Sequence, residues 1–108
     1  MAVRCDAMPL PVTPGESKDK IRIHLFVSGK VQGVYFRHNT RIVAIKFGVK
    51  GWVRNVEDGQ VEAVLEGDEV SVNAVLEWCH TGPSNAVVDV VKVEYEGYRG
   101  EFLDFSII

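Results

Sequence analysis

The sequence predicts one α+β domain whose elements follow the order βαββαβ, with a short extra strand at the end. Stretches in which every second residue is apolar alternate with stretches whose apolar residues recur at helical spacing. Gly-Pro and Asp-Gly signals mark several of the places where these elements end. The length of 108 residues suits a single domain, with enough chain for one hydrophobic core but not for two.

The composition narrows the classes of function. Apolar residues make up 46% and charged residues 25% of the chain, as in an ordinary globular domain, and the net charge is -3. An acidic balance argues against a general nucleic-acid binder, which usually carries a basic excess. No apolar run approaches the roughly 20 residues of a membrane span, and the N-terminus lacks the apolar core of a signal peptide. We therefore expect a cytoplasmic protein without membrane or nucleic-acid partners.

The first half of the domain contains two strands and a helix. Residues 21–28 form the first expected strand, whose apolar face carries Ile21, Ile23, Leu25 and Val27. The first helix is expected over residues 35–47, with an apolar side made of Phe36, Thr40, Val43, Ala44 and Phe47. Gly48 suits the position just past the end of this helix. A second strand then covers residues 49–55.

The second half begins with a tight turn. Asp58-Gly59 is a strong hairpin signal and leads into a third strand over residues 61–66. Asp68 can cap a second helix, which Gly82-Pro83 ends and whose apolar side carries Val72, Val75, Leu76 and Cys79. A fourth strand covers residues 86–95, and its apolar parity changes after Val90, which predicts a bulge or a change of partner. A turn over residues 98–101 and a last strand over residues 102–107 complete the domain.

This order of elements is typical of the ferredoxin-like βαββαβ sandwich, in which both helices cover one face of an antiparallel sheet. The first helix must cross right-handedly between two parallel strands. The loop after the first strand then lies at that strand's C-terminal end, where α/β folds tend to bind ligands. Residues 1–20 hold three of the four prolines and a charged run, so we expect them to form a flexible tail before a domain of residues 21–108.

Residues 29–37, Gly-Lys-Val-Gln-Gly-Val-Tyr-Phe-Arg, are the stretch most informative about function. Gly29 and Gly33 free the backbone to turn sharply and to present its N–H groups. A loop at a helix start binds anions well, because unpaired N–H groups point outward and the helix dipole adds partial positive charge. Arg37 adds a planar guanidinium that can hold two phosphate oxygens. The stretch predicts a phosphate site, although Arg37 could also be a solvated surface residue.

Asn55 is the second candidate for chemistry. Its neutral side-chain amide provides a donor and an acceptor, which can hold a water molecule and direct one of its lone pairs. An asparagine at the end of a strand can equally bond its own backbone in the turn, so position alone leaves both interpretations open.

The histidines and cysteines, including Cys5, lack the spacing of metal ligands, and no serine or cysteine has an evident base partner. Neither a metal site nor covalent catalysis is expected, and Cys79 is expected to be a small buried apolar group.

The candidate residues belong to two longer signatures. The first reads Gly29-x-Val31-Gln32-Gly33-Val34-x-Phe36-Arg37. The second reads Gly51-Trp52-Val53-Arg54-Asn55-x-x-x-Gly59-x-Val61 and is followed by Gly67. Together these signatures resemble those of the acylphosphatase family. Trp78, Gly82-Pro83 and residues 105–107 also fit, so the resemblance covers roughly residues 21–108. One departure is Val56, at a position where some members have threonine or serine.

The resemblance implies hydrolysis of the carboxyl–phosphate anhydride of small acyl phosphates to a carboxylate and inorganic phosphate. It also implies that Arg37 binds the phosphate and that Asn55 orients the attacking water. The loop amides that complete the phosphate site come from Lys30, Val31, Gln32, Gly33, Val34, Tyr35 and Phe36. No metal or organic cofactor is implied. Inorganic phosphate is expected as product and competitive inhibitor, and the protein is expected to be a monomer.

Three other functions stay open from the sequence. A ferredoxin-like module could bind a phosphorylated metabolite or protein without turning it over, though such a module has little need of a water-holding amide at Asn55. The domain could work inside a larger carbamoyl-transfer protein, but the chain ends soon after its last strand and has no zinc-ligand cysteine pairs. A nucleic-acid binder on a similar sheet is disfavoured by the acidic balance and by the lack of a basic aromatic motif.

Overall fold

The computed structural model describes residues 19–108, and the predictions for residues 1–18, Cys5 among them, lie outside this range. The elements are β1 (Lys20–Lys30), α1 (Phe36–Phe47), β2 (Lys50–Asn55), β3 (Val61–Asp68), α2 (Glu69–Thr81), β4 (Val87–Glu96) and β5 (Phe105–Ile107). The predicted βαββαβ order with an extra C-terminal strand is therefore confirmed. Most element ends differ from the expected ones by one or two residues, and β5 is the main exception.

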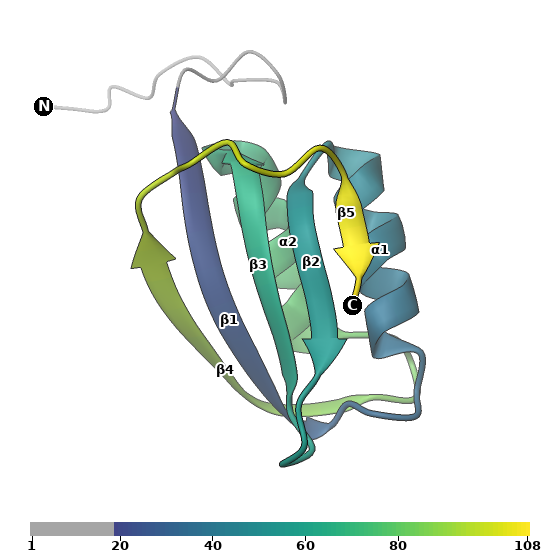
Figure 1. Ribbon diagram of the computed structural model, residues 1–108. Coiled ribbons are helices and arrows are strands. Elements are labelled where there is room, and N and C mark those ends of the chain that lie inside the picture. Colours follow the sequence, from purple (N-terminus) through teal and green to yellow (C-terminus); the bar gives the residue numbers. More distant parts are fainter. Residues whose placement is uncertain (1–18) are drawn as a thin grey trace, which may run out of the picture.

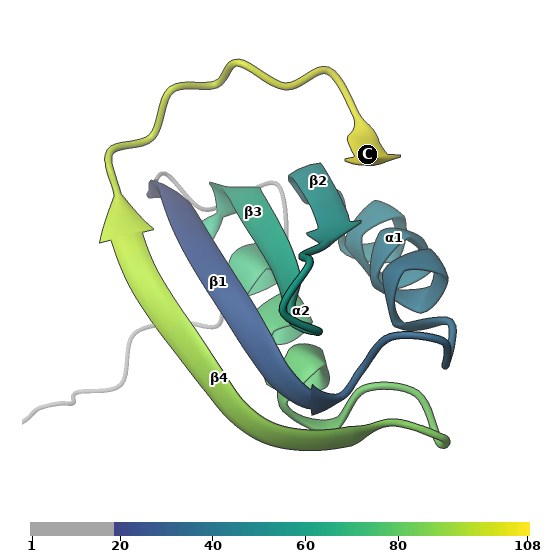
Figure 2. The same ribbon diagram turned by 60° about the horizontal axis from the view of Figure 1, so that its bottom comes forward.

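The five strands form one sheet in the order β4-β1-β3-β2-β5. β1 pairs antiparallel with both β3 and β4, and β2 pairs antiparallel with β3. β5 is parallel to its neighbour β2, so the sheet as a whole is mixed. Both helices lie on the same side of this sheet, behind it in Figure 1 and to the right of β1 and β4 in Figure 2. The fold is the expected two-layer ferredoxin-like sandwich.

The core lies between the sheet and the two helices. Alternate residues of the central strands point into it, and each helix adds the apolar side that its periodicity predicts. Its buried side chains include Ile23, Leu25, Val27, Phe36, Ala44, Val53, Val61, Leu65, Val72, Val75 and Cys79. Burial raises the pKa of the Cys79 thiol to about 12, so this cysteine stays protonated and packs as a small apolar group, as expected.

The pairing of β1 with β4 contains the irregularity that the change of apolar parity predicts. Ser28 pairs with Val90, but the next residue, Gly29, pairs with Val88, so Asp89 is an extra residue on β4. Gly29 has a φ of 127°, and a Cβ there would lie 2.1 Å from the carbonyl oxygen of Val87. The bulge therefore requires glycine at position 29, directly before the chain leaves the sheet for α1.

The C-terminal part differs from the expected turn over residues 98–101 and strand over residues 102–107. Residues 97–104 have no regular structure, and only the last three of the expected strand residues pair with β2. The irregular segment crosses the ends of the strands from β4 at one edge of the sheet to β5 at the other (Figure 1). The prediction was wrong here because this path depends on contacts with β1 and β3 rather than on a local pattern.

Arg22 of β1 holds this crossover in place. Its side chain is 8% exposed, and its guanidinium forms ion pairs with Glu101 at 2.6 Å, Glu96 at 2.7 Å and Glu66 at 3.2 Å. Burial alone would lower the pKa of Arg22, but the three carboxylates outweigh it and raise that pKa. The ring of Phe102 lies 5.3 Å from the guanidinium carbon. Because Glu101 belongs to the crossover, these contacts guide the chain toward β2.

The start of α2 also differs from the prediction in its chemistry. Asp68 occupies the expected N-cap position, but its side chain does not bond the N–H groups of the helix. It pairs instead with Lys20 of β1. The N–H of Glu69 donates to the carbonyl of Asp19, so backbone rather than a side chain satisfies the first donor of this helix.

Candidate functional site

The loop between β1 and α1 is held from the inside by two valines. Val31 and Val34 are both buried in the core. Between and after them, Gly33 and Tyr35 adopt positive φ values of 77° and 62°. Tyr35 is the one non-glycine residue in the described range 19–108 with this left-handed backbone, and its side chain is exposed. The buried valines fix the loop to the core, while Gly33 and Tyr35 determine the path of its solvent-facing part.

Tyr35 is also the N-cap of α1. Its side chain makes no hydrogen bond to the first turn, and that turn contains no acidic residue. The N–H groups at this helix start are therefore not occupied by a capping side chain or by a local carboxylate. Such groups attract an anion, because they are unpaired donors at the positive end of the helix dipole.

A pocket of about 340 Å³ opens beside this loop. It lies where the loop, the end of β2 and the end of β5 come together, at the lower right in Figure 1. Its volume suits a small ligand. The pocket is lined by Val31, Gly33, Tyr35, Phe36, Arg37, His38, Asn55 and Ile107.

Arg37 and Asn55 meet in this pocket although they come from different elements. Arg37 is in the first turn of α1 and is half-buried, whereas Asn55 is the last residue of β2 and is exposed. Neither side chain has a hydrogen-bond or ion-pair partner among residues 19–108. A guanidinium and a neutral amide are thus both available to a ligand in the same cavity.

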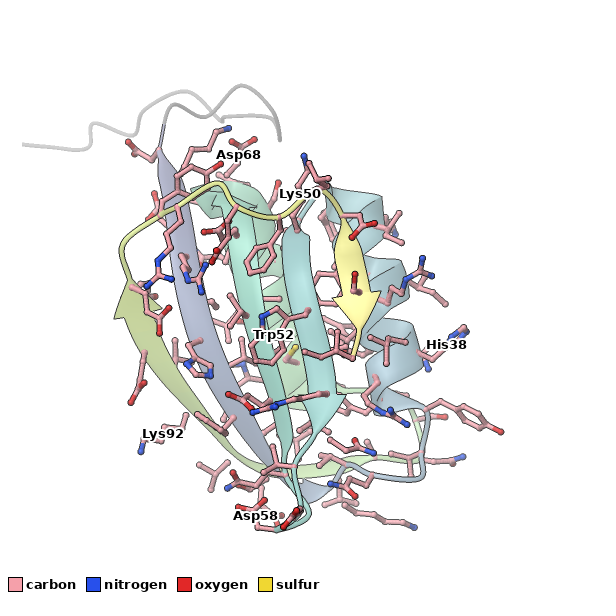
Figure 3. The ribbon with its side chains drawn as sticks, viewed as in Figure 1. His38, Lys50, Trp52, Asp58, Asp68 and Lys92 are labelled. Carbon is pink, nitrogen blue, oxygen red and sulfur yellow. The ribbon has the colours of Figure 1, made fainter. Side chains whose placement is uncertain are left out.

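The turn after β2 closes without the side chain of Asn55. The N–H of Val56 donates to the carbonyl of Gln60 at 2.8 Å, and the N–H of Gly59 donates to the carbonyl of Val56 at 3.0 Å. Asp58, labelled at the tip of this turn in Figure 3, accepts a hydrogen bond from the N–H of Gln60 at 3.0 Å. The turn role considered for Asn55 therefore belongs to Asp58.

Three of the predicted loop residues do not line the pocket. Lys30 is exposed at the end of β1, and Val34 belongs to the core. The side chain of Gln32 turns toward the β2–β3 turn, where it donates to the carbonyls of Val56 and Gln60. His38, which points outward from α1 in Figure 3, is exposed at the edge of the pocket.

Comparison with known proteins identifies the family. The family model described as Acylphosphatase matches residues 23–107. The chain belongs to the acylphosphatase family. An acylphosphatase of Syntrophus aciditrophicus (strain SB) is 54% identical over 87 residues, which cover 81% of this chain and 91% of that protein. An acylphosphatase of Pyrobaculum islandicum (strain DSM 4184 / JCM 9189 / GEO3) is 50% identical over 91 residues, which cover 83% of this chain and 96% of that protein.

A solved structure gives the same result. The structure of an acylphosphatase from Coxiella burnetii matches with a TM-score of 0.80 at 38% identity, covering 84% of this chain and 95% of that one. These matches confirm the resemblance carried by the two signatures, the ferredoxin-like fold and the expectation of a hydrolase. Within residues 19–108, no helix is both long enough and apolar enough to cross a membrane.

In this acylphosphatase-family chain, Phe36 fixes the start of α1 against α2. Its ring is buried and lies 5.4 Å from the ring of Trp78, centroid to centroid. A Cβ at Gly82, just past the end of α2, would lie 2.7 Å from the Phe36 ring. The close approach of Gly82 therefore lets the end of α2 support the helix turn that carries Arg37.

The alternating direction of side chains along β2 places Asn55 on the pocket side of the sheet. Arg54, the preceding residue, is held on the face of the sheet away from the helices, where its Nε donates to Glu62 at 2.7 Å. Glu62 also lies 2.6 Å from Nε2 of His24. Burial raises the pKa of Glu62, but the hydrogen bonds from His24 and Arg54 outweigh it and hold that pKa below its ordinary value. Because successive side chains of a strand point to opposite faces, anchoring Arg54 leaves Asn55 on the pocket side.

Ile107, like His38, lines the pocket but was not among the site residues expected from the sequence. It pairs with Val53, so it lies beside β2 a short distance before Asn55. The last strand has only three residues, and its partner is set by the crossover that Arg22 anchors. A local pattern could predict a strand near this position but could not place it next to the pocket.

Proposed function

We propose that this protein hydrolyses small acyl phosphates in the pocket beside the β1–α1 loop and releases a carboxylate and inorganic phosphate. One observation carries the proposal: Arg37 and Asn55 line the same pocket, and neither side chain has a partner within residues 19–108. Membership of the acylphosphatase family supports this reaction. The named roles of the two residues are supported by their chemistry and by their shared cavity.

The phosphoryl group binds at the start of α1. The N–H groups of the loop from Lys30 to Phe36 and of the first helical turn donate to its oxygens, and the Arg37 guanidinium adds a two-pronged charged contact. Loop geometry that is fixed by the buried valines keeps these donors aimed before the substrate arrives. Preorganised donors of this kind stabilise charge that develops on the phosphoryl oxygens in the transition state.

Asn55 orients the attacking water from the end of β2. Its amide oxygen accepts a hydrogen bond from the water and so directs a lone pair of the water at phosphorus. As the new P–O bond forms, the bond from phosphorus to the acyl oxygen breaks, and the carboxylate leaves with the electron pair. The proton lost by the water passes to a phosphoryl oxygen or to solvent. No strong base is required, because a carboxylate is a good leaving group and the transition state of phosphoryl transfer is loose.

The test is an assay with benzoyl phosphate in the presence of a metal chelator. We expect the wild-type protein to hydrolyse it and inorganic phosphate to inhibit competitively. Arg37→Gln should lower kcat/KM by at least about 100-fold, since one donor to a developing oxyanion contributes about 3–4 kcal/mol. Arg99→Gln is the matched control, because Arg99 is exposed and lies away from the pocket, and it should leave activity unchanged.

A wild-type protein that binds phosphate but does not hydrolyse benzoyl phosphate would contradict the proposal. That result would favour the non-catalytic phosphate-binding module instead. Equal activity of Arg37→Gln and Arg99→Gln would remove Arg37 from the site.

A further inference from the structure

We propose that Gln32 is a positioning residue, whose side chain holds Asn55 at a fixed place relative to the phosphate-binding loop. It does so by bonding the loop to the turn between β2 and β3. The inference rests on the proposed function, because it concerns how the phosphate-binding loop and Asn55 are kept in fixed positions relative to each other. It assigns to the Gln32 side chain a role separate from that of its backbone amide.

The contact is made by both donors of one amide group. Nε2 of Gln32 donates to the carbonyl of Val56 at 2.7 Å and to the carbonyl of Gln60 at 3.0 Å. Two carbonyl oxygens can be met only by the nitrogen end of the amide, so the orientation of the side chain is defined by its chemistry. The contact is partly buried, where a hydrogen bond competes less with water.

The two accepting carbonyls are those that close the turn. The Gln60 carbonyl also accepts from the N–H of Val56, and the Val56 carbonyl also accepts from the N–H of Gly59. Gln32 therefore completes a small network rather than touching the turn at one point. In both Figure 1 and Figure 2, this turn lies beside the chain as it leaves β1 for the loop.

The network connects two walls of the pocket. On one side, Gln32 stands between Val31 and Gly33, which line the pocket from the loop. On the other side, Val56 directly follows Asn55, which lines the pocket from β2. A shift of the turn relative to the loop would therefore move Asn55 relative to the bound phosphoryl group.

Such a shift should affect turnover rather than phosphate binding. In-line attack depends on where the water held by Asn55 lies relative to phosphorus, and a misplacement of about 1 Å can cost roughly 100-fold in rate. Phosphate binding depends on the loop amides and Arg37, which the Gln32 side chain does not contact. The expected signature is a lower kcat with an unchanged affinity for inorganic phosphate.

The chain contains its own matched control. Gln60 is the other glutamine, and its Nε2 donates to Oγ of Ser28 at 2.9 Å. This bond ties the same turn to β1, but it does not reach the residues that line the pocket. Replacing either glutamine with methionine keeps the length of the side chain and removes its hydrogen bonds.

The experiment measures kcat with benzoyl phosphate and the inhibition constant of inorganic phosphate for both variants. We expect Gln32→Met to lower kcat by about ten- to a hundred-fold and to change the phosphate inhibition constant by less than about threefold. Gln60→Met should change kcat by less than about threefold. In the background of Asn55→Ala, Gln32→Met should cause no further loss, because its effect acts through Asn55.

A second variant keeps the test decisive if Gln32→Met does not fold. In Gln32→Glu, an ionised carboxylate faces two carbonyl oxygens and offers no proton, so kcat should fall at neutral pH. As the pH falls, protonation supplies one donor, and activity relative to wild type at the same pH should rise. This recovery would show that activity depends on the donated hydrogen bond and not on the bulk of the side chain.

Three results would overturn the inference. They are full kcat in Gln32→Met, a loss of phosphate affinity that matches the loss of kcat, or an equal loss in the wild-type and Asn55→Ala backgrounds. Each of these is measured against an active wild-type protein. An inactive wild type would instead overturn the proposed function itself.

Discussion

Gly29 and Gly33 both lie in the stretch of residues 29–37 but meet different physical needs. At Gly29, φ is 127° and a Cβ would lie 2.1 Å from the Val87 carbonyl oxygen. At Gly33, φ is 77°, but no heavy atom lies within 4 Å of the place where a Cβ would be. Position 29 therefore needs glycine for both conformation and space, whereas position 33 needs it for conformation alone.

The two alanine variants should differ accordingly. Gly33→Ala should lower the free energy of unfolding by about 1–2 kcal/mol, the cost of a left-handed backbone for a residue with a Cβ. Gly29→Ala should lower it by about 3 kcal/mol or more, because the bulge with β4 must also open. Urea denaturation of both variants measures this difference, and equal losses would show that the close contact at Gly29 is unimportant.

At the residue scale, the sequence was most informative where side chains have a distinctive chemistry. Arg37 and Asn55 could be chosen because a guanidinium and an amide suit phosphate and water, and the structure brings both into one pocket. The hydrogen bonds of Gln32 could not be predicted, because their acceptors are backbone carbonyls, which every residue possesses. The sequence alone also could not decide whether Asn55 or Asp58 bonds the turn, because the partner of Asp58 is a backbone N–H, a group that nearly every residue possesses.

At the scale of elements, periodicity predicted the helices and central strands but not the path of residues 97–104. The change of parity in β4 marks the bulge at Asp89, because a bulge is itself a local pattern. The crossover has no such pattern, since Arg22 of β1 holds its Glu101 and Glu66 of β3 accepts a hydrogen bond from the N–H of its Arg99. Ile107 reaches the pocket only because of this anchoring.

The anchoring role of Arg22 can be tested by its removal. Arg22→Met should lower the free energy of unfolding by roughly 3 kcal/mol, because Glu66 would stay buried without its cation. Arg99→Met is a suitable control, since Arg99 is exposed and lies 3.7 Å from Glu101, and it should cost less than about 1 kcal/mol. Guanidinium titrations of both variants give the comparison, and similar losses would argue against a special role for Arg22.

At the scale of the whole molecule, the face of the sheet away from the helices is linked by charged groups. His24 connects Glu62 on β3, at 2.6 Å, with Glu96 on β4, at 3.3 Å. The hydrogen bond from Arg22 lowers the pKa of Glu96, and those from His24 and Arg54 lower the pKa of Glu62 against the effect of burial. Four strands therefore share one network, in which Glu62 and Glu96 are more acidic than an ordinary glutamate.

The pH dependence of stability follows from these shifts. An unfolded chain takes up protons at the ordinary glutamate pKa of 4.5, whereas the folded protein resists them until lower pH. The contribution of these two carboxylates to the free energy of unfolding should therefore be complete above about pH 5. It should decrease as the pH falls below that value. Glu62→Gln should make this fall less steep in denaturant titrations at a series of acidic pH values. An unchanged slope would show that Glu62 does not couple folding to protonation.

The fold as a whole was the most predictable level, because alternation, helical spacing and turn signals agree along the chain. The family follows from two long signatures, and its model matches residues 23–107. The sequence could not predict that the β1–α1 loop, the end of β2 and β5 line the same pocket. That arrangement arises from pairing between strands far apart in the chain.

The division of labour between Arg37 and Asn55 is tested most directly by one variant, Asn55→Ala, with turnover of benzoyl phosphate and binding of inorganic phosphate measured on the same preparation. We expect kcat to fall at least about 100-fold while the dissociation constant of phosphate, from isothermal titration calorimetry, changes by less than about threefold. Undiminished turnover, or a loss of phosphate binding as large as the loss of turnover, would contradict the assignment of Asn55 to the attacking water.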